Sequence, residues 1–337
     1  MPDCMQGAAG LNKMKHLLKQ HEFYLAALIL LLVAGLSTGT EDFLTLGNIF
    51  DMTVSSAILG IMACGLFVVL IAGGIDISFP ATAAIAQYLT ASYILANGGN
   101  FPLAFAMAAV VGMVLGMLNA TLVYKLKVPA IIITIAMLNV YFGLLIYFTD
   151  GEWLYGFPDW FMNGVELLSF TGSDGYDYGL NLPILMLLAC IALTALLMNK
   201  TRIGRQIYAM GGNSDAAGRI GINLFGLNLF VYGYMGALAG IAAVVQTQIT
   251  QSVAPNSLMG FELTVLAAVV LGGTSMTGGK GTLLGVVLGV ALLAILKNGL
   301  TLLGVPSYWH TVVTGLIILL SISITALNEK QQAKQEA

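Results

Sequence analysis

The sequence has little charge. Of its 337 residues, Asp, Glu, Lys and Arg make up only 9%, whereas 58% are apolar or aromatic, and the mean hydropathy is +0.90. Soluble proteins carry about 25% charged residues, because water must cover their surface. The composition therefore excludes a soluble enzyme, a nucleic-acid-binding protein and a disordered chain. It indicates a polytopic membrane protein embedded in a lipid bilayer.

The sequence also has few residues for disulfides, metal sites or polar catalysis. Cys4, Cys64 and Cys190 lie far apart, and the three histidines show no ligand spacing. An intramembrane enzyme would need a catalytic pair such as Ser/His, paired Asp or His-x-x-x-His, and none is present. There is no Gly-x-x-x-x-Gly-Lys-Ser/Thr phosphate loop either. We therefore expect no enzymatic activity, no metal and no cofactor bound by this chain itself.

Long apolar runs dominate the sequence. A hydrocarbon core about 30 Å thick needs about 20 apolar residues per helix. That rule selects ten runs: 23–39, 53–72, 80–96, 102–123, 129–148, 182–198, 224–247, 262–272, 282–297 and 311–327. The run 262–272 is too short to cross alone, which indicates a broken or re-entrant helix. The runs predict an all-α membrane protein of about ten transmembrane helices, and its 40 glycines predict close helix packing.

The basic residues predict the topology. Lysines and arginines gather in cytoplasmic segments of membrane proteins, and here they cluster before the first run, after the fourth and sixth runs, and in the tail. This pattern makes both termini cytoplasmic. It divides the chain into a cytoplasmic segment 1–22, a membrane domain 23–327 and a cytoplasmic tail 328–337. Within the domain, 149–181 is an external loop and 199–223 an internal basic loop. We expect the first run to be a retained helix and not a cleaved signal, because it follows a hydrophilic stretch.

Two segments resemble each other and suggest an internal repeat. Val69–Gly74 and Val269–Gly273 have similar sequences, and each leads from an apolar run through a polar break into another apolar run. The span count places both breaks on the cytoplasmic side, whereas an inverted repeat would place them on opposite sides, so either the repeat is parallel or one of the ten spans is wrong. Chance similarity of glycine-rich apolar sequence is the alternative.

The first break contains a carboxylate. Gly73, Gly74, Asp76 and Ser78 lie between two apolar runs, and Pro80 follows them. Glycines and a proline interrupt a membrane helix, and the freed backbone groups must be satisfied by protein or water. We expect this segment, together with Gly272 and Gly273 of the second break, to act as a hinge or pathway wall. A helix cap at the interface and direct contact of Asp76 with a solute are the alternatives.

The internal loop has a pattern of its own. Two short amphipathic helices are predicted, over 202–210 and 214–220, with Ser214 as N-cap of the second and Gly211-Gly212-Asn213 as the break. Its small residues would leave a flat face on which another protein could sit. The pattern is similar to the cytoplasmic coupling loop of permease subunits from ATP-binding-cassette importers for simple sugars, the ribose-type family. Those permeases show Gly-Arg, Tyr-Ala, Gly-Gly-Asn, Ala-Ala and Gly-Ile in the same order.

Two further stretches carry the resemblance, which covers about residues 50–328. Gly73–Ser78 resembles the family's Gly-Gly-Ile-Asp-Leu-Ser motif, and Ala267–Ser275 with Gly278, Gly279 and Gly281 resembles its late glycine-rich motif. Phe79-Pro80 stands where the family usually has Val-Gly, and Thr264 where it often has an acidic residue. The external stretch 149–158 is similar to autoinducer-2-type permeases, without naming a substrate.

The resemblance implies a bundle of the type II-like importer permeases in a bacterial cytoplasmic membrane. It implies as partners two ATPase domains that bind ATP and Mg²⁺, a second permease subunit and an extracytoplasmic solute-binding protein. Closure of the ATPases would move the bundle through the internal loop. The residues expected to couple the two are Gly204, Arg205, Tyr208, Ala209, Gly211, Gly212, Asn213, Ala216, Ala217, Arg219, Gly221 and Ile222.

A neutral sugar would need amides and hydroxyls along its path. Candidate solute contacts in or at the ends of the apolar runs are Asn119, Asn139, Gln246, Gln248 and Gln251. The alternative is that these residues hold helices together. The competing function is an ion-coupled secondary transporter, which would normally use buried carboxylates or charge pairs. Only Asp76 is a candidate for such a relay, and a secondary transporter does not need the internal loop.

Overall fold

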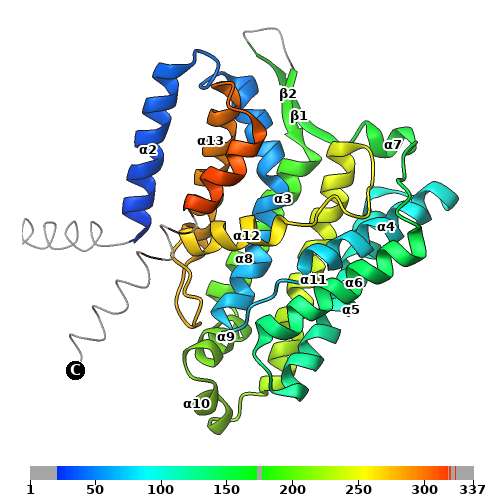
Figure 1. The fold of residues 1–337 in the computed structure, drawn as a ribbon, viewed down its shortest axis with the longest axis vertical. Helices are drawn as coiled ribbons and strands as arrows, with labels where there is room; N and C mark the ends of the chain where they lie inside the picture. The colour runs from blue at the N-terminus through cyan, green and yellow to red at the C-terminus, as the bar shows by residue number, and fades with distance from the viewer. Residues whose placement is uncertain (1–20, 173–176, 318, 320–322, 324–337) are drawn as a thin grey trace, which may run out of the picture.

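The computed structural model describes residues 21–172, 177–317, 319 and 323, and most of them are helical (Figure 1). The helices are α2 (His21–Gly39), α3 (Leu46–Ile71), α4 (Phe79–Asn97), α5 (Phe101–Leu126), α6 (Ala130–Thr149), α7 (Asp159–Met162), α8 (Leu182–Lys200), α9 (Arg202–Gly212), α10 (Ser214–Arg219), α11 (Leu224–Thr250), α12 (Phe261–Leu271) and α13 (Leu283–Leu302). Residues 307–317 are helical as well. The predicted terminal segments 1–22 and 328–337 lie outside the described residues, apart from the first turn of α2.

The all-α membrane fold is confirmed. Among the described residues, seven helices are long and apolar enough to span a bilayer: α2, α3, α5, α6, α8, α11 and α13. Helix α4 fills the predicted run 80–96 but is not among the seven. Helix α12 has eleven residues, a length of about 16 Å at 1.5 Å per residue. The tenth run, 311–327, lies mostly outside the described residues, so the count of ten remains a prediction.

Helix α3 forms the centre of the bundle. All residues from Ala57 to Ile71 are buried, and the helix packs against α8, α11, α12 and α13. A helix that is apolar on every side belongs in the middle of a bundle, where no face meets lipid. The first break directly follows α3, and the second follows α12, which packs against α3. Both breaks therefore adjoin the core.

Helices α5 and α11 meet at glycine positions, where their backbones touch directly. We call this line of contact the seam. A Cβ on Gly112 would touch the carbonyl of Gly236, a Cβ on Gly236 would touch the carbonyl of Gly112, and Gly116 faces the carbonyl of Tyr232 in the same way. Small residues four apart allow two membrane helices to pack backbone to backbone. The close packing predicted from the glycine content is thus located in this pair.

The predicted external loop is not wholly irregular. It contains α7 and an antiparallel hairpin of β1 (Glu166–Thr171) and β2 (Asp177–Asn181), which the apolar runs did not predict. The register shifts between Leu167 and Ser169 because Leu168 adopts a positive φ of 60° and forms a bulge. The hairpin lies at one end of the molecule, while α9 and α10 lie at the opposite end (Figure 1).

The two segments of the suggested repeat end their helices in the same way. After α3, Gly73 N–H donates to Leu70 O and Gly74 N–H to Val69 O; after α12, Gly273 N–H donates to Val270 O and Thr274 N–H to Val269 O. Gly73 and Gly273 have φ of 84° and 83°, a left-handed geometry that favours glycine. The sequence similarity therefore corresponds to a shared helix cap.

Candidate coupling site and helix breaks

The internal loop forms the two predicted helices, α9 and α10, with different boundaries. Helix α9 continues through Gly211 and Gly212, so the predicted three-residue break is wrong. The break is confined to Asn213, whose Oδ1 accepts a hydrogen bond of 2.9 Å from Ala216 N–H. Asn213, and not Ser214, is therefore the N-cap of α10. We call residues 201–223 the coupling segment.

The predicted coupling residues divide into an outer and an inner set. The outer set is exposed: Arg205, Ala209, Gly212, Asn213, Ala216, Arg219 and Gly221. The inner set is buried or half-buried: Gly204, Tyr208, Gly211, Ala217 and Ile222. Only the outer set is exposed, so a docking face could include only this part of the predicted residues, and the docking itself remains a prediction. The inner set holds the segment on the bundle.

Three parts of the chain meet backbone to backbone beneath α9. The end of α9, the end of α3 and the turn after α12 contribute Gly211, Gly73, Gly278 and Gly279, which we call the glycine junction. A Cβ on Gly211 would meet Ile71 O and lie 2.7 Å from Gly279 N, and a Cβ on Gly278 would lie 2.8 Å from Gly73 Cα. Gly279 N–H donates a 2.9 Å hydrogen bond to Ile71 O. Both breaks therefore touch the coupling segment.

A side-chain contact reinforces the junction. Tyr208 Oη donates a 2.9 Å hydrogen bond to Gly281 O, in the turn that follows α12. Burial raises the pKa of the Tyr208 phenol, so the hydroxyl remains a donor at neutral pH. Ser275 N–H closes the same turn by donating to Lys280 O at 2.9 Å. Helix α9 is thus tied to the second break by a side chain as well as by glycine contacts.

The first break is closed by a chain of buried hydrogen bonds. Asp76 Oδ1 accepts from Ser78 N–H at 2.8 Å and from Ser78 Oγ at 2.6 Å. Ser78 Oγ in turn accepts from Asn119 Nδ2 at 2.6 Å, and Asn119 Oδ1 accepts from Tyr141 Oη at 2.9 Å. Asp76 is 2% exposed and Ser78 is not exposed at all. The network connects the break to α5 and α6.

This geometry gives Asp76 a structural role in the first break. Asp76 bonds the residue two positions on, as in an Asx turn, and Ser78, the N-cap of α4, makes no cap bond with its own side chain. The carboxylate therefore fixes the shape of the break inside the protein. Gly272, which starts the second break, packs on the backbone of Gly285 in α13, so both breaks lie against neighbouring helices.

The predicted solute contacts are spread over three helices, and three of them lie at the end of α11. Asn119 is fully buried and its amide bonds Ser78 and Tyr141, so it holds helices together. Asn139 is exposed on α6 and donates to Ile135 O. Gln246 and Gln248 are half-buried on α11. Gln251 is exposed and caps the end of α11.

Sequence reasoning missed a buried polar pair on α4 and α11. Gln87 is 1% exposed, and its Nε2 donates a 2.9 Å hydrogen bond to Thr247 Oγ1. Ser257 Oγ reaches Gln87 Oε1 at 3.5 Å. A glutamine within an apolar run is itself a signal of an interior face. The run 80–96 contains that signal at its centre, away from the run ends where most of the predicted contacts lie.

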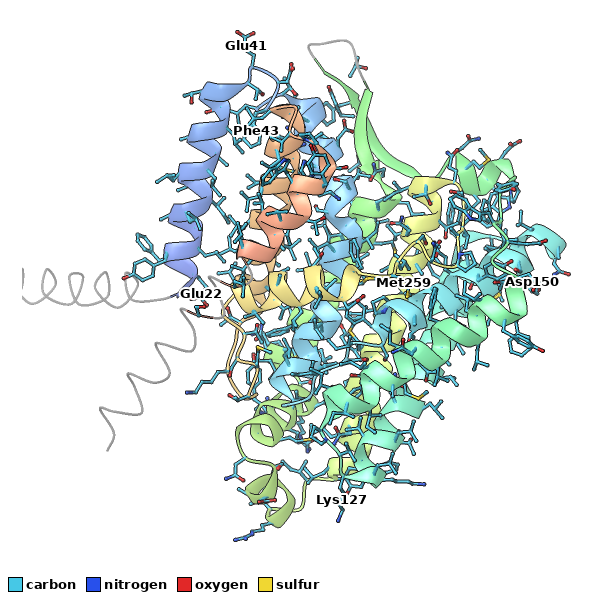
Figure 2. All side chains as sticks on the ribbon, viewed as in Figure 1. Glu22, Glu41, Phe43, Lys127, Asp150 and Met259 are labelled. Atoms are coloured by element: carbon cyan, nitrogen blue, oxygen red, sulfur yellow. The ribbon has the colours of Figure 1, made fainter. Side chains whose placement is uncertain are left out.

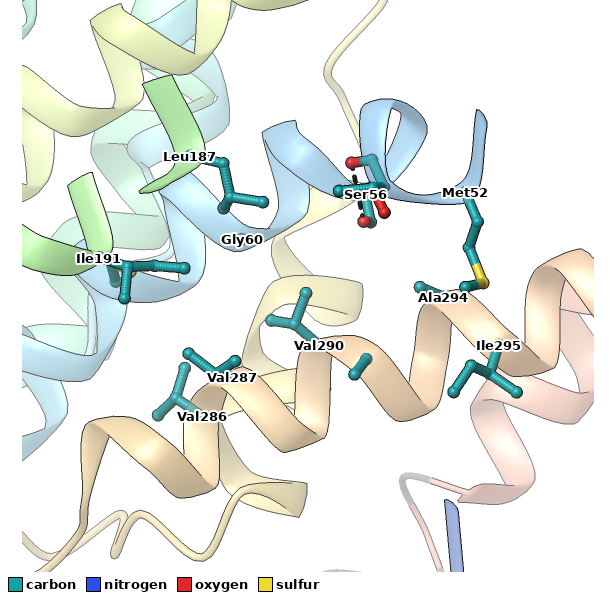
Figure 3. Close-up of a pocket in the computed structure, with 13 residues that line it drawn as sticks. Met52, Ser56, Gly60, Leu187, Ile191, Val286, Val287, Val290, Ala294 and Ile295 are labelled. Atoms are coloured by element: carbon teal, nitrogen blue, oxygen red, sulfur yellow. Dashed lines mark hydrogen bonds between the residues drawn. The ribbon is translucent and has the colours of Figure 1, made fainter. Parts of the chain in front are cut away.

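A cleft of about 190 Å³ lies between α3, α8 and α13 (Figure 3). Its lining is mostly apolar, with Gly60, Leu187 and Val290 among its walls. The hydroxyls of Thr53 and Ser56 are already engaged with the carbonyls of Ile49 and Thr53. A site for a sugar needs polar groups directed at the ligand, so this cleft does not match one.

Comparison with known proteins agrees with this fold. Residues 48–322 match the family described as branched-chain amino acid transport system / permease component. The ribose import permease protein RbsC of Escherichia coli K12 is 34% identical over 303 residues, which cover 90% of this chain and 92% of the relative. The D-allose transport system permease protein AlsC of the same strain is 32% identical, covering 93% of each chain.

The autoinducer 2 import system permease protein LsrC of Photorhabdus luminescens is 30% identical, covering 86% of this chain and 85% of the relative. No solved structure matches the chain. The resemblance to ribose-type permeases drawn from three motifs is confirmed by these relatives. The chain belongs to the family of branched-chain amino acid transport system permease components.

Proposed function

We propose that this chain is the membrane permease subunit of an ATP-binding-cassette importer for a simple sugar or a sugar-like solute. The relatives named for ribose, D-allose and autoinducer 2 import support this class of solute. ATP–Mg²⁺ would be bound and hydrolysed by two separate ATPase domains. A second permease subunit and an extracytoplasmic binding protein would complete the importer in the cytoplasmic membrane, with both termini of this chain on the cytoplasmic side.

The glycine junction is the observation that carries the proposal. The exposed part of the coupling segment is available to an ATPase, while its inner part touches both helix breaks through Gly211. Backbone atoms in direct contact leave no soft side chains between the elements. A displacement of α9 would therefore reach the ends of α3 and α12 together and change the shape of the bundle.

The ion-coupled alternative has weaker support. It needs a carboxylate that is free to bind and release an ion. Asp76 instead holds the backbone N–H and the hydroxyl of Ser78 with one oxygen, and Asn119 keeps Ser78 in place.

Substitution of Ala216 by Arg tests the proposal. Ala216 is exposed on α10, so the larger side chain keeps the fold but obstructs a partner. We expect Ala216→Arg to insert and fold normally, to lose ATPase subunits on co-purification, and to lose ATP-dependent uptake. Normal association and uptake, or uptake driven by an ion gradient without ATPase subunits, would overturn the proposed role.

A further inference from the structure

Helix α4 carries an unusual set of buried polar side chains. It has no charged residue, and it packs against α5, α6 and α11 inside the bundle. Thr82, Gln87 and Thr90 are 1%, 1% and 3% exposed, so none of them faces lipid or bulk water. Uncharged amides and hydroxyls of this kind suit a neutral, hydroxylated ligand.

The two threonines differ from threonines in the other membrane helices. A threonine in a helix normally donates its hydroxyl to the carbonyl four residues earlier. That bond is made by Thr53, Thr121, Thr194, Thr247, Thr301 and Thr314. Among the described residues, the hydroxyls of Thr82 and Thr90 have no hydrogen-bond partner at all. Burying an unpaired hydroxyl costs folding free energy, so each such group calls for a partner such as a water, an ion or a ligand.

The glutamine between them also has an amide oxygen that is available to accept a hydrogen bond. Gln87 Nε2 donates to Thr247, but Gln87 Oε1 is reached only by Ser257 Oγ at 3.5 Å, a long contact. Ser257 lies in the stretch between α11 and α12, outside either helix. Gln87 therefore contacts a stretch of chain whose backbone is not helical. Within a membrane protein, non-helical backbone occurs where it is buried in protein or lines a cavity, and broken helices form the solute sites of many transporters.

We infer that Thr82, Gln87 and Thr90 line the solute path, and that their free hydroxyl and amide oxygens bind the hydroxyls of a neutral sugar as it passes. We call this set the α4 polar face. The inference rests on the proposed function and adds the residues that meet the solute. Helix α4 begins directly after the first break, and Thr82 N–H donates to Ser78 O. A movement at the glycine junction would therefore move the α4 polar face.

Valine is the substitution that tests the inference, because it keeps the shape of threonine and removes only the hydroxyl. Thr82→Val and Thr90→Val would each replace an unpaired buried hydroxyl by a methyl group, so thermal stability should stay the same or rise. Uptake of labelled D-ribose or D-allose by cells producing the complete importer should fall about tenfold, the effect of losing one hydrogen bond. Thr121→Val on α5 is the control, since Thr121 is a half-buried threonine outside α4 whose hydroxyl is bonded to Met117 O.

The outcomes separate the possibilities. Reduced uptake with unchanged or raised stability in Thr82→Val or Thr90→Val, and normal uptake in Thr121→Val, supports the α4 polar face as the solute contact. Normal uptake in both variants overturns it, and so does a parallel loss of stability and uptake, which indicates a structural role. If the unmodified importer hydrolyses ATP but carries neither sugar nor autoinducer 2, the proposed solute class itself is wrong, and this inference falls with it.

Discussion

At the scale of single residues, Gly211 is a position in the coupling segment that has no room for a side chain. Its missing side chain is what lets α9 rest on Ile71 O and Gly279 N. In Gly211→Ala the new methyl group would separate Gly279 N–H from Ile71 O, which are 2.9 Å apart. Forcing one methyl into packed backbone typically costs about 1–3 kcal/mol. We expect a lower melting temperature in detergent and a loss of ATP-dependent uptake.

The neighbouring residue gives the matched control. A Cβ on Gly212 would meet nothing within 4 Å, so Gly212→Ala should melt at the temperature of the unmodified protein. The two variants differ by one position and carry the same added methyl group. Equal melting temperatures for both would contradict the glycine junction.

Asp76 allows a graded test of the first break. In Asp76→Asn the remaining amide oxygen can still accept from Ser78, whereas Asp76→Ala leaves the N–H and hydroxyl of Ser78 without that acceptor. An unsatisfied buried donor costs about 1–3 kcal/mol. We expect uptake and melting temperature to decrease from the unmodified protein to Asp76→Asn and further to Asp76→Ala. Similar behaviour of Asp76→Ala and the unmodified protein would show that the carboxylate is incidental.

Some residue roles could be predicted from the sequence and some could not. Gly73, Gly74, Asp76 and Ser78 were predicted to form a break, because glycines and a carboxylate within apolar sequence interrupt a membrane helix. For Asn119 the sequence left two roles open, a solute contact or a bond between helices, because sequence does not show which face of a helix meets a neighbour. Its burial and its two side-chain partners became visible only with α4 and α6 in place.

At the scale of elements, the seam between α5 and α11 should be the most sensitive helix pair. In Gly236→Ala the added Cβ would touch the carbonyl of Gly112, and the two helices would have to separate along the seam. In a bilayer the hydrophobic effect does not drive helices together, so the association of α5 and α11 depends on their close packing. Loss of that packing should therefore weaken the pair. We expect Gly236→Ala to yield less folded protein and to melt at a lower temperature.

Gly143 in α6 provides the control for this seam. It has nothing within 4 Å of its Cβ position, so Gly143→Ala should be neutral in yield and in melting temperature. If Gly236→Ala were as stable as Gly143→Ala, the close approach of α5 and α11 would not be maintained in the membrane.

The predicted helix boundaries were wrong where a helix continues through polar residues beyond its apolar run. Helix α3 begins at Leu46, seven residues before the apolar run at 53, because Thr45 caps it by accepting from Asn48 N–H and the helix continues through polar residues. The hairpin of β1 and β2 was missed because it lies outside the apolar runs, and because β1 does not alternate regularly between polar and apolar residues. Its support comes from outside the loop, where Phe50 of α3 stacks on Tyr178 with ring centroids 5.2 Å apart.

At the scale of the whole molecule, basic residues gather at the end that carries the coupling segment. Lys127 lies at the end of the molecule that carries α9 and α10, and Glu41 lies at the opposite end near the hairpin (Figure 2). Arg202, Arg205 and Arg219 belong to the coupling segment itself. The positive-inside rule assigns the basic end to the cytoplasm, where ATPase subunits and ATP would be found.

Cysteine labelling in intact cells tests this orientation. Asp215 is exposed on α10 and Trp153 is exposed by 57% in the predicted external loop, so each is replaced by cysteine in a Cys4→Ala background. The native Cys64 and Cys190 are buried and should not react. We expect a membrane-impermeant maleimide to label Trp153→Cys in intact cells, and Asp215→Cys only after the membrane is permeabilised. The reverse pattern would place the coupling segment outside the cell, away from any nucleotide, and would remove the physical basis for driving this bundle with ATP.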